Sequence, residues 1–277
     1  MTLSRRDIAA MLEAHGLHPR RALGQNFVAD PNTVRRIARL AELEPGDAVV
    51  EVGAGLGSLT LALAETGASV TAVEVDRHLV PLLRENVEPV GVRVVEDDAM
   101  TLDWGALLAG HDDWSLVANL PYNVAVPVLA RVLDEATPVR RMLVMVQEEV
   151  GARLVASPHS RAYGAVSVKV AYHAHARVVG RVPASVFVPR PRVESVLVRI
   201  ERRPVVAVDP AIVPASTLFR LVRLGFGQRR KMLRGSLGGA VPAGAFAAAG
   251  VDPRARAEDL DVAAWGRLAA ATVEEGP

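Results

Sequence analysis

Val49-Val50-Glu51-Val52-Gly53-Ala54-Gly55-Leu56-Gly57 is the stretch of sequence that decides the fold. A short run of apolar, β-branched residues leads directly into a turn that carries glycine at every second position. Glycine permits a tight turn and lets a ligand approach the backbone with no Cβ in the way. A buried strand that ends in such a turn is typical of an α/β sheet that binds a nucleotide at the carboxyl ends of its strands.

Similar strand-like runs recur along the chain and alternate with segments of helical spacing. The runs lie at 48–52, 69–75, 92–95, 116–118 and 142–146, and the helical segments between them at 58–66, 77–87, 101–109 and 124–135. This alternation predicts an α/β fold whose mostly parallel sheet is covered by helices on both faces. Two helices are expected before the first strand, at 5–14 and 31–42, and two further strands near the sheet edge, at 166–173 and 193–200.

A change in composition indicates a second domain. Residues 203–210 run from Arg-Pro to Asp-Pro and read as a linker. Beyond them, Ala-, Leu- and Gly-rich segments have helical spacing and no strand signal. We therefore expect a sheet-containing domain over residues 1–204, with an N-terminal helical extension, and a small helical domain over residues 205–277.

The composition excludes several classes of protein. The 277 residues include no Cys, which excludes disulfides and thiolate metal sites, and we expect no bound metal. Every long apolar run is broken by a charge, Gly or Pro, so no stretch is long enough to span a bilayer. The N-terminus lacks the uninterrupted apolar core of a signal peptide. We therefore expect a cytoplasmic protein with no membrane partner.

The formal net charge of +1 conceals an uneven distribution of charge. No acidic residue occurs from Pro210 through Val251, and that segment carries the basic residues Arg220, Arg223, Arg229, Arg230, Lys231 and Arg234. Such asymmetry predicts a surface that binds a polyanion. The alternative is a solvated helix face, which a basic run forms about as often when it stands alone.

A second motif, Asn119-Leu120-Pro121-Tyr122, lies downstream of the glycine turn. The Asn119 side-chain oxygen and the Leu120 carbonyl can each accept a hydrogen bond from an NH₂ group, and Tyr122 offers a flat face for a base. Alone, Asn-X-Pro is also an ordinary turn signal. In this order after a glycine turn, the motif predicts a nucleoside-like cofactor held beside an exocyclic amino group.

Two acids are spaced to complete the cofactor site. Glu74 ends the next strand, 21 positions after Gly53 (74 − 53), where an acid can accept hydrogen bonds from both ribose hydroxyls. Asp98 follows the third strand, where it can accept from an adenine amino group. A dinucleotide favours G-x-G-x-x-G, and ATP favours a Gly-Lys-Ser/Thr that this chain lacks. The G-x-G-x-G turn with Glu51 before it instead resembles motif I of S-adenosylmethionine-dependent methyltransferases.

This cofactor and the Asn119 motif together predict methyl transfer to the N6 atom of an adenine. The acceptors at Asn119 and Leu120 would align the amino group and stabilise the positive charge that grows on its nitrogen. Tyr122 would stack on one face of an unpaired or flipped-out base. Phe187, in a proline-rich loop, is the candidate for the other face; the alternative is a buried core aromatic.

The chain resembles the KsgA-type ribosomal RNA adenine dimethyltransferase family over about residues 20–235. Besides the glycine turn and Asn119–Tyr122, the matching motifs are Gly24-Gln25-Asn26-Phe27, Glu74-Val75-Asp76, Asp98-Ala99-Met100, Tyr163 through Val168, Phe187 through Val198, and Phe226 through Leu233. Their occurrence in family order makes coincidence very improbable. The resemblance implies a Rossmann-like class I methyltransferase sheet that uses S-adenosyl-L-methionine.

The resemblance also implies roles for individual residues. Asn26 and Val28 would close over the cofactor, and Gly53, Glu74, Asp98 and Asn119 would contact it. The implied substrate is two adjacent adenosines in the loop of the 3′-terminal helix of small-subunit (16S) rRNA, dimethylated during ribosome biogenesis. The helical domain would bind RNA or the ribosome, with contributions from a basic run at Arg20 and Arg21. We expect the enzyme to act as a monomer.

Two alternatives remain open at this point. A related methyltransferase that protects the large subunit from macrolides shares the cofactor motifs, but it usually has Asn-Ile-Pro-Tyr-like sequences and a different C-terminal domain. Leu120 and the motifs from Phe187 onward favour the small-subunit enzyme. A non-catalytic ribosome-assembly factor could have inherited the same fold. The intact Glu74, Asp98, Asn119 and Tyr122 argue against that alternative.

Overall fold

The computed structural model describes residues 2–20 and 23–274. The chain forms two compact units, one comprising Met1–Gly151 and Arg177–Glu201 and the other Ala152–Ala176 and Arg202–Pro277. The chain last passes from the first unit to the second between Glu201 and Arg202, close to the boundary expected at residue 204. The segment 152–176 also belongs to the second unit, which the linker signal alone did not indicate.

A seven-stranded sheet in the order β4-β3-β2-β5-β6-β9-β7 organises the first unit. Its strands are β2 (Ala48–Val52), β3 (Ser69–Glu74), β4 (Arg93–Glu96), β5 (Trp114–Asn119), β6 (Val139–Gln147), β7 (Ala174–Val182) and β9 (Ser195–Arg202). The strands β2 to β6 are parallel, and β9 runs antiparallel to β6. The β2 strand is buried along its whole length, as its apolar sequence predicts.

The strand order places a ligand site. From β2 the chain passes outward through β3 and β4, then returns to the other side of β2 to form β5 and β6. The order therefore reverses between β2 and β5, and ligands bind at the carboxyl ends of strands at such a point. The glycine turn follows β2 and Asn119 ends β5, so both motifs lie at this position.

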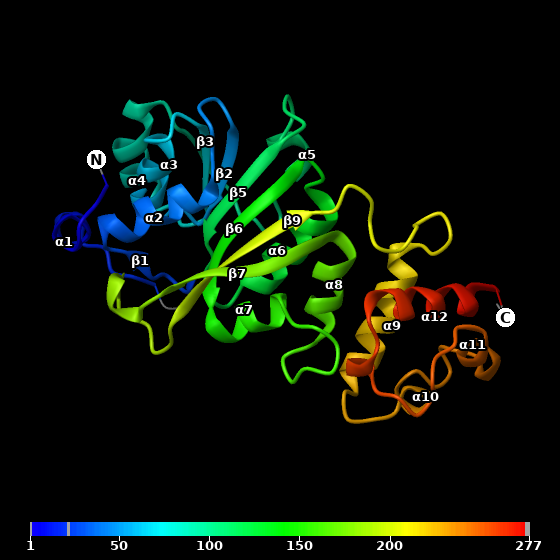
Figure 1. Ribbon diagram of the computed structural model, residues 1–277. Coiled ribbons are helices and arrows are strands. Elements are labelled where there is room, and N and C mark those ends of the chain that lie inside the picture. The colour runs from blue at the N-terminus through cyan, green and yellow to red at the C-terminus, as the bar shows by residue number, and fades with distance from the viewer. Residues whose placement is uncertain (1, 21–22, 275–277) are drawn as a thin grey trace. The chain divides into compact units, whose positions relative to one another are not determined.

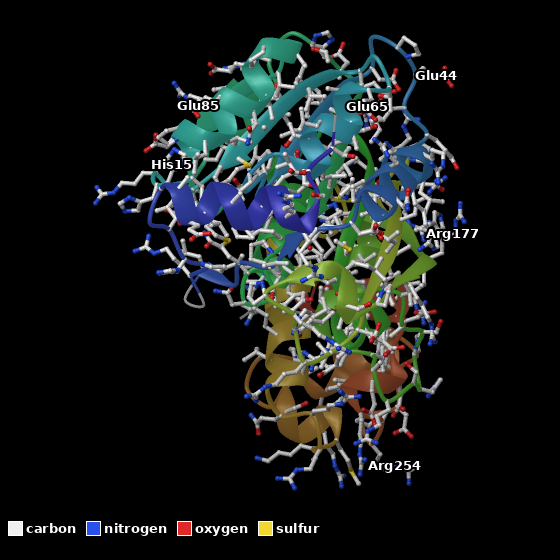
Figure 2. The ribbon with its side chains drawn as sticks, turned by 90° about the vertical axis from the view of Figure 1, so that its left-hand side faces the viewer. His15, Glu44, Glu65, Glu85, Arg177 and Arg254 are labelled. Carbon is white, nitrogen blue, oxygen red and sulfur yellow. The ribbon has the colours of Figure 1, made fainter. Side chains whose placement is uncertain are left out.

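Helices lie on both sides of the sheet, and the expected α/β fold is confirmed (Figure 1). They are α1 (Arg5–Ala14), α2 (Pro31–Ala41), α3 (Ser58–Ala64), α4 (Val80–Val87), α5 (Trp104–Leu107), α6 (Ala125–Glu135) and α7 (Glu148–Leu154). Asp30 caps α2, since its side chain accepts from the Thr33 N–H at 3.0 Å, and Pro31 occupies the first turn. In Figure 2, Glu44 lies at the upper right edge of this unit, and His15 and Glu85 lie on its left side.

A short ribbon of two strands lies outside the main sheet. It pairs β1 (Phe27–Val28) with β8 (Phe187–Val188) in antiparallel register, and a turn of 3₁₀ helix (Ala184–Val186) precedes β8. The sequence did not predict this ribbon, because a strand of two residues carries no periodic signal. It joins a segment near the N-terminus to the proline-rich loop.

The prediction of a strand at residues 166–173 is wrong, because this segment forms the helix α8 (Ala165–His173). Its valines at every second position imitate a strand pattern, but the helix buries Ser167, Val168, Val170, Tyr172 and His173, which lie on more than one side of it. A helix buried on several sides loses the 3.6-residue period of an amphipathic one. The edge strand is β7, which begins immediately after α8.

The second unit is helical, as expected. It contains α8, α9 (Ala215–Gly227), α10 (Leu233–Ser236), α11 (Ala243–Ala248) and α12 (Val262–Glu274). Its apolar core is centred on fully buried residues such as Trp265 and Leu218. Gly225 allows α9 to approach α12 closely, because a Cβ there would lie 2.7 Å from the Trp265 ring.

Candidate functional site

A pocket with about 750 Å³ of empty space, partly open to solvent, lies at the carboxyl ends of β2 and β5. Its walls come from the glycine turn, from Glu51 and Glu74, from Asn119–Tyr122, and from residues 23–28, which we call the strap. Residues that are far apart in sequence therefore meet at the point where the strand order reverses.

The glycine turn has the backbone that its sequence predicted. Gly53, Gly55 and Gly57 have φ angles of 75°, 60° and 89°, in the left-handed region that favours glycine. A Cβ on Gly55 would also come within 3.0 Å of the Phe27 ring in the strap. The turn and the strap are thus in close contact only because residue 55 has no side chain.

Glu74 is almost completely buried and is held by three main-chain N–H groups. Its Oε1 accepts from Val75 at 3.1 Å and from Asp76 at 2.9 Å, and its Oε2 accepts from Gly55 at 2.7 Å. Burial raises the pKa of Glu74 above its usual value. A carboxylate offers about four acceptor positions, so one position on Oε2 remains for a ligand hydroxyl.

Glu51 lines the same pocket and is only 1% exposed. Burial raises the pKa of Glu51 to about 8, and the neighbouring Glu74 carboxylate contributes to the rise. Among the described residues, neither its Oε2 nor the buried Ser58 Oγ nearby in the lining has a hydrogen-bond partner. Buried polar atoms are nearly always paired, so these two groups fit a ligand that carries hydrogen-bond donors. Glu51 was not among the predicted site residues, although a carboxyl inside a buried strand was a usable signal.

Asn119 is fixed by the strap. Its Nδ2 donates to the Asn26 carbonyl at 2.9 Å, and the Asn26 Nδ2 donates to the Gly24 carbonyl at 3.0 Å. The first bond occupies the donor side of the Asn119 amide, and its acceptor Oδ1 has no hydrogen-bond partner among the described residues. Leu120 and Val28 are buried beside it in the lining, at 1% and 4% exposure.

Tyr122 forms a fixed flat wall of the pocket. Its hydroxyl lies 3.0 Å from the Ser195 Oγ at the start of β9, and the ring is partly buried. Burial raises the pKa of Tyr122, so the hydroxyl remains protonated at neutral pH. A ring held at its far end in this way presents its face without having to be ordered by a ligand.

The strap is anchored to the buried side chain of Asp76. The Gln25 Nε2 donates to Asp76 Oδ2 at 2.8 Å, and the Arg20 guanidinium lies 3.4 Å from Asp76 Oδ1. Gly24 packs on the Asn119 motif, since a Cβ there would lie 3.2 Å from the Pro121 Cβ and 3.4 Å from the Tyr122 N. Asp76 thus connects the strap to the strand end that carries Glu74.

Two predicted site residues do not line the pocket. Phe187 is 0% exposed and packs in the core, opposite Val28 in the β1–β8 ribbon. With its ring enclosed, it has no face for a base, and the alternative of a core aromatic fits its position. Asp98 is exposed, and its Oδ1 accepts from the Met100 N–H at 2.8 Å. Its loop lies beside the site, because Asp97 N–H donates to the Glu74 carbonyl at 3.1 Å.

The predicted basic residues fall into two groups. The side chains of Arg220, Arg223, Arg230 and Lys231 are exposed. Arg229 instead donates to the Glu258 carboxylate at 2.7 Å and to the Arg161 carbonyl at 2.8 Å, so it links three segments of the second unit. Arg21 lies outside the described residues.

Within residues 2–20 and 23–274, no group of His, Asp and Glu is arranged to hold a metal ion. No helix in the described part of the chain is long and apolar enough to cross a bilayer.

Comparison with known proteins gives matches over most of the chain. The family model for ribosomal RNA adenine dimethylase matches residues 16–272. A ribosomal RNA small subunit methyltransferase A of Kineococcus radiotolerans is 49% identical over 97% of this chain and 91% of its own length. A dimethyladenosine transferase from Plasmodium falciparum has a similar fold, with a TM-score of 0.72, 20% identity, and coverage of 86% of this chain and 94% of that one. The 23S rRNA methyltransferase ErmE is similar with a TM-score of 0.65 and 26% identity, over 89% of this chain and 99% of that one.

Proposed function

This chain belongs to the ribosomal RNA adenine dimethylase family, and we propose that it dimethylates N6 of two adjacent adenosines in the loop of the 3′-terminal helix of 16S rRNA. S-Adenosyl-L-methionine is the proposed methyl donor, and the reaction would take place in the cytoplasm during ribosome biogenesis. The observation that carries the proposal is the Asn119 amide in the pocket lining, whose donor side is occupied by the Asn26 carbonyl and whose acceptor Oδ1 has no partner among the described residues.

The residues of the pocket fit the proposed cofactor. The remaining acceptor position of Glu74 suits a ribose hydroxyl, and the unpartnered Glu51 Oε2 suits the ammonium group of an amino acid moiety. The glycine turn leaves room for that moiety against the backbone. Asp98, on the loop beside Glu74, is proposed to accept from the adenine amino group. When bound, the cofactor supplies a methyl group already activated by its sulfonium charge.

The chain's own task is to prepare the nucleophile. The lone pair of an adenine N6 is delocalised into the ring, and the attack makes the nitrogen positive. Asn119 Oδ1 and the Leu120 carbonyl would accept from the two N6 hydrogens, align the lone pair and stabilise the growing charge. A dedicated base is not required, since the alkylated nitrogen is far more acidic than before. Tyr122 would hold the ring of a base that has left its helix.

The second unit is the proposed RNA-binding part. Arg220, Arg223, Arg230 and Lys231 are exposed on a segment without acids and can contact phosphates. Arg20, which is 55% exposed despite its pairing with Asp76, could contribute from the first unit. We expect one copy of the chain to act on one small subunit.

Methylation of purified ribosomal subunits tests the proposal. The protein is incubated with tritiated S-adenosyl-L-methionine and with small or large subunits from a strain that lacks this enzyme. We expect label in the small subunit only, and a new reverse-transcriptase stop at adjacent adenosines near the 3′ end of its rRNA. Label in the large subunit would favour the macrolide-resistance type of enzyme, and no label in either would favour a non-catalytic assembly factor.

A further inference from the structure

The loop of residues 189–194, which we call the rim loop, is fixed at both ends to the wall of the pocket. It begins after Val188, which pairs with the pocket residue Phe27 across the β1–β8 ribbon. It ends before Ser195, whose Oγ lies 3.0 Å from the Tyr122 hydroxyl. The loop therefore connects the strap side of the pocket with the side where Tyr122 is proposed to hold the target base.

The last residue of the rim loop ties it to the protein. The Glu194 carboxylate accepts from the Ala184 N–H at 3.2 Å, and the Glu194 carbonyl accepts from the Glu148 N–H at 3.1 Å. Pro189 and Pro191 further restrict the backbone, because their rings fix φ. The loop thus presents its side chains from a largely preformed position.

The two arginines of this loop, Arg190 and Arg192, are exposed and have neither a hydrogen bond nor an ion pair within the described part of the chain. The nearby Arg181 differs, since it lies 3.5 Å from the Glu148 carboxylate. Val193, next in sequence, is 44% exposed. Two uncompensated guanidinium groups and an apolar side chain therefore project from a loop fixed beside the pocket.

We propose that the rim loop is an RNA-binding site, in which Arg190 and Arg192 bind the phosphates that flank the target adenosine. The inference rests on the proposed function. Taking a base out of its stack costs free energy, and contacts to the flanking backbone offset that cost and fix the register of the RNA. Guanidinium groups suit the role because they bind phosphate oxygens in pairs. Val193 packs against the sugar or base next to the target.

The test compares two variants of the full chain that lose the same charge. Arg190→Ala/Arg192→Ala removes the rim-loop arginines, and Arg140→Ala/Arg177→Ala removes two exposed arginines of β6 and β7. Affinity for small subunits is measured over a series of salt concentrations, together with single-turnover methylation and the calorimetric Kd for S-adenosyl-L-methionine.

We expect the rim-loop variant to bind small subunits about tenfold more weakly. Its slope of log affinity against log salt concentration should be smaller by about 2, because each lost phosphate contact reduces the slope by about 1. Its methylation at limiting subunit should fall in parallel, its cofactor Kd should stay unchanged, and the control variant should match the wild type. Equal salt slopes for the rim-loop and control variants would overturn the inference. Failure of the wild type to methylate would instead count against the proposed function, and the salt titration would still decide the role of the loop.

Discussion

The Asn119 side-chain amide donates to the main-chain carbonyl of Asn26 at 2.9 Å, across 93 positions of sequence. One end of this bond belongs to β5 and the other to the strap over the cofactor pocket. The bond fixes which atom of the amide is left to meet a substrate. It also makes the proposed acceptor for the target amino group depend on the position of the strap.

Glu74→Ala should weaken binding of S-adenosyl-L-methionine more than it slows a saturated turnover. A hydrogen bond to a charged group contributes about 1.5–3 kcal/mol, which corresponds to a Kd raised roughly 10- to 150-fold. Titration calorimetry measures the Kd, and a thermal melt in the absence of cofactor shows whether the glycine turn has been disturbed. An unchanged Kd in a folded variant would show that Glu74 does not bind the cofactor.

Glu51 should make stability depend on pH in the cofactor-free protein. Its folded pKa of about 8 lies above the ordinary glutamate value of 4.5, so its contribution to stability is fully present below pH 4.5 and is lost as pH rises through 8. Relative to Glu51→Gln, the wild type should lose on the order of a few kcal/mol of unfolding free energy between pH 5 and pH 8. Urea denaturation of both proteins at a series of pH values measures this difference, and parallel pH curves would show that Glu51 does not titrate in this range.

Asp76→Asn should loosen the strap. The new amide would place a donor against the Gln25 Nε2, which now donates to Asp76 at 2.8 Å. We expect a Kd for S-adenosyl-L-methionine raised about tenfold, as for the loss of one hydrogen bond to a charged group, with a smaller change in saturated turnover.

Asp76→Asn combined with Gln25→Glu tests whether the effect comes from this contact. The double variant restores a donor facing an acceptor and should recover most of the affinity. A Kd that the single variant leaves unchanged, or that the double variant fails to recover, would show that Asp76 does not position the strap.

The basic residues of the second unit should differ in role, with Arg230 and Lys231 binding RNA and Arg229 stabilising the fold. Arg230→Ala/Lys231→Ala removes exposed charges, so binding to small subunits should weaken and its salt slope should fall by about 2. Arg229→Ala breaks contacts to Glu258 and Arg161, so it should lower the unfolding free energy by about 1–3 kcal/mol. Salt titrations measure the binding to small subunits, and urea denaturation measures the unfolding free energy. An equal loss of stability in both variants would contradict the separate structural role of Arg229.

The sequence predicted those parts of the site that depend on the local conformation of the backbone. The glycine turn could be predicted because three left-handed positions require glycine, and its place at the end of β2 follows from the alternation of elements. The helix α8 could not be separated from a strand, because burial on several sides hides its period. The position of Phe187 depends on a two-strand ribbon with Val28, which no short-range signal indicates. The role of Arg229 depends on Glu258, a partner 29 positions away.

Single-turnover methylation of small subunits at saturating cofactor tests the central claim, that Asn119 orients the target amino group. Asn119→Ala should react about 10²- to 10³-fold more slowly than the wild type, as expected when a preorganised partner of a developing charge is lost. Asn26→Ala keeps the main-chain carbonyl that holds Asn119, so its rate at saturating cofactor should fall far less. An Asn119→Ala variant that runs at the wild-type rate would contradict the proposed mechanism.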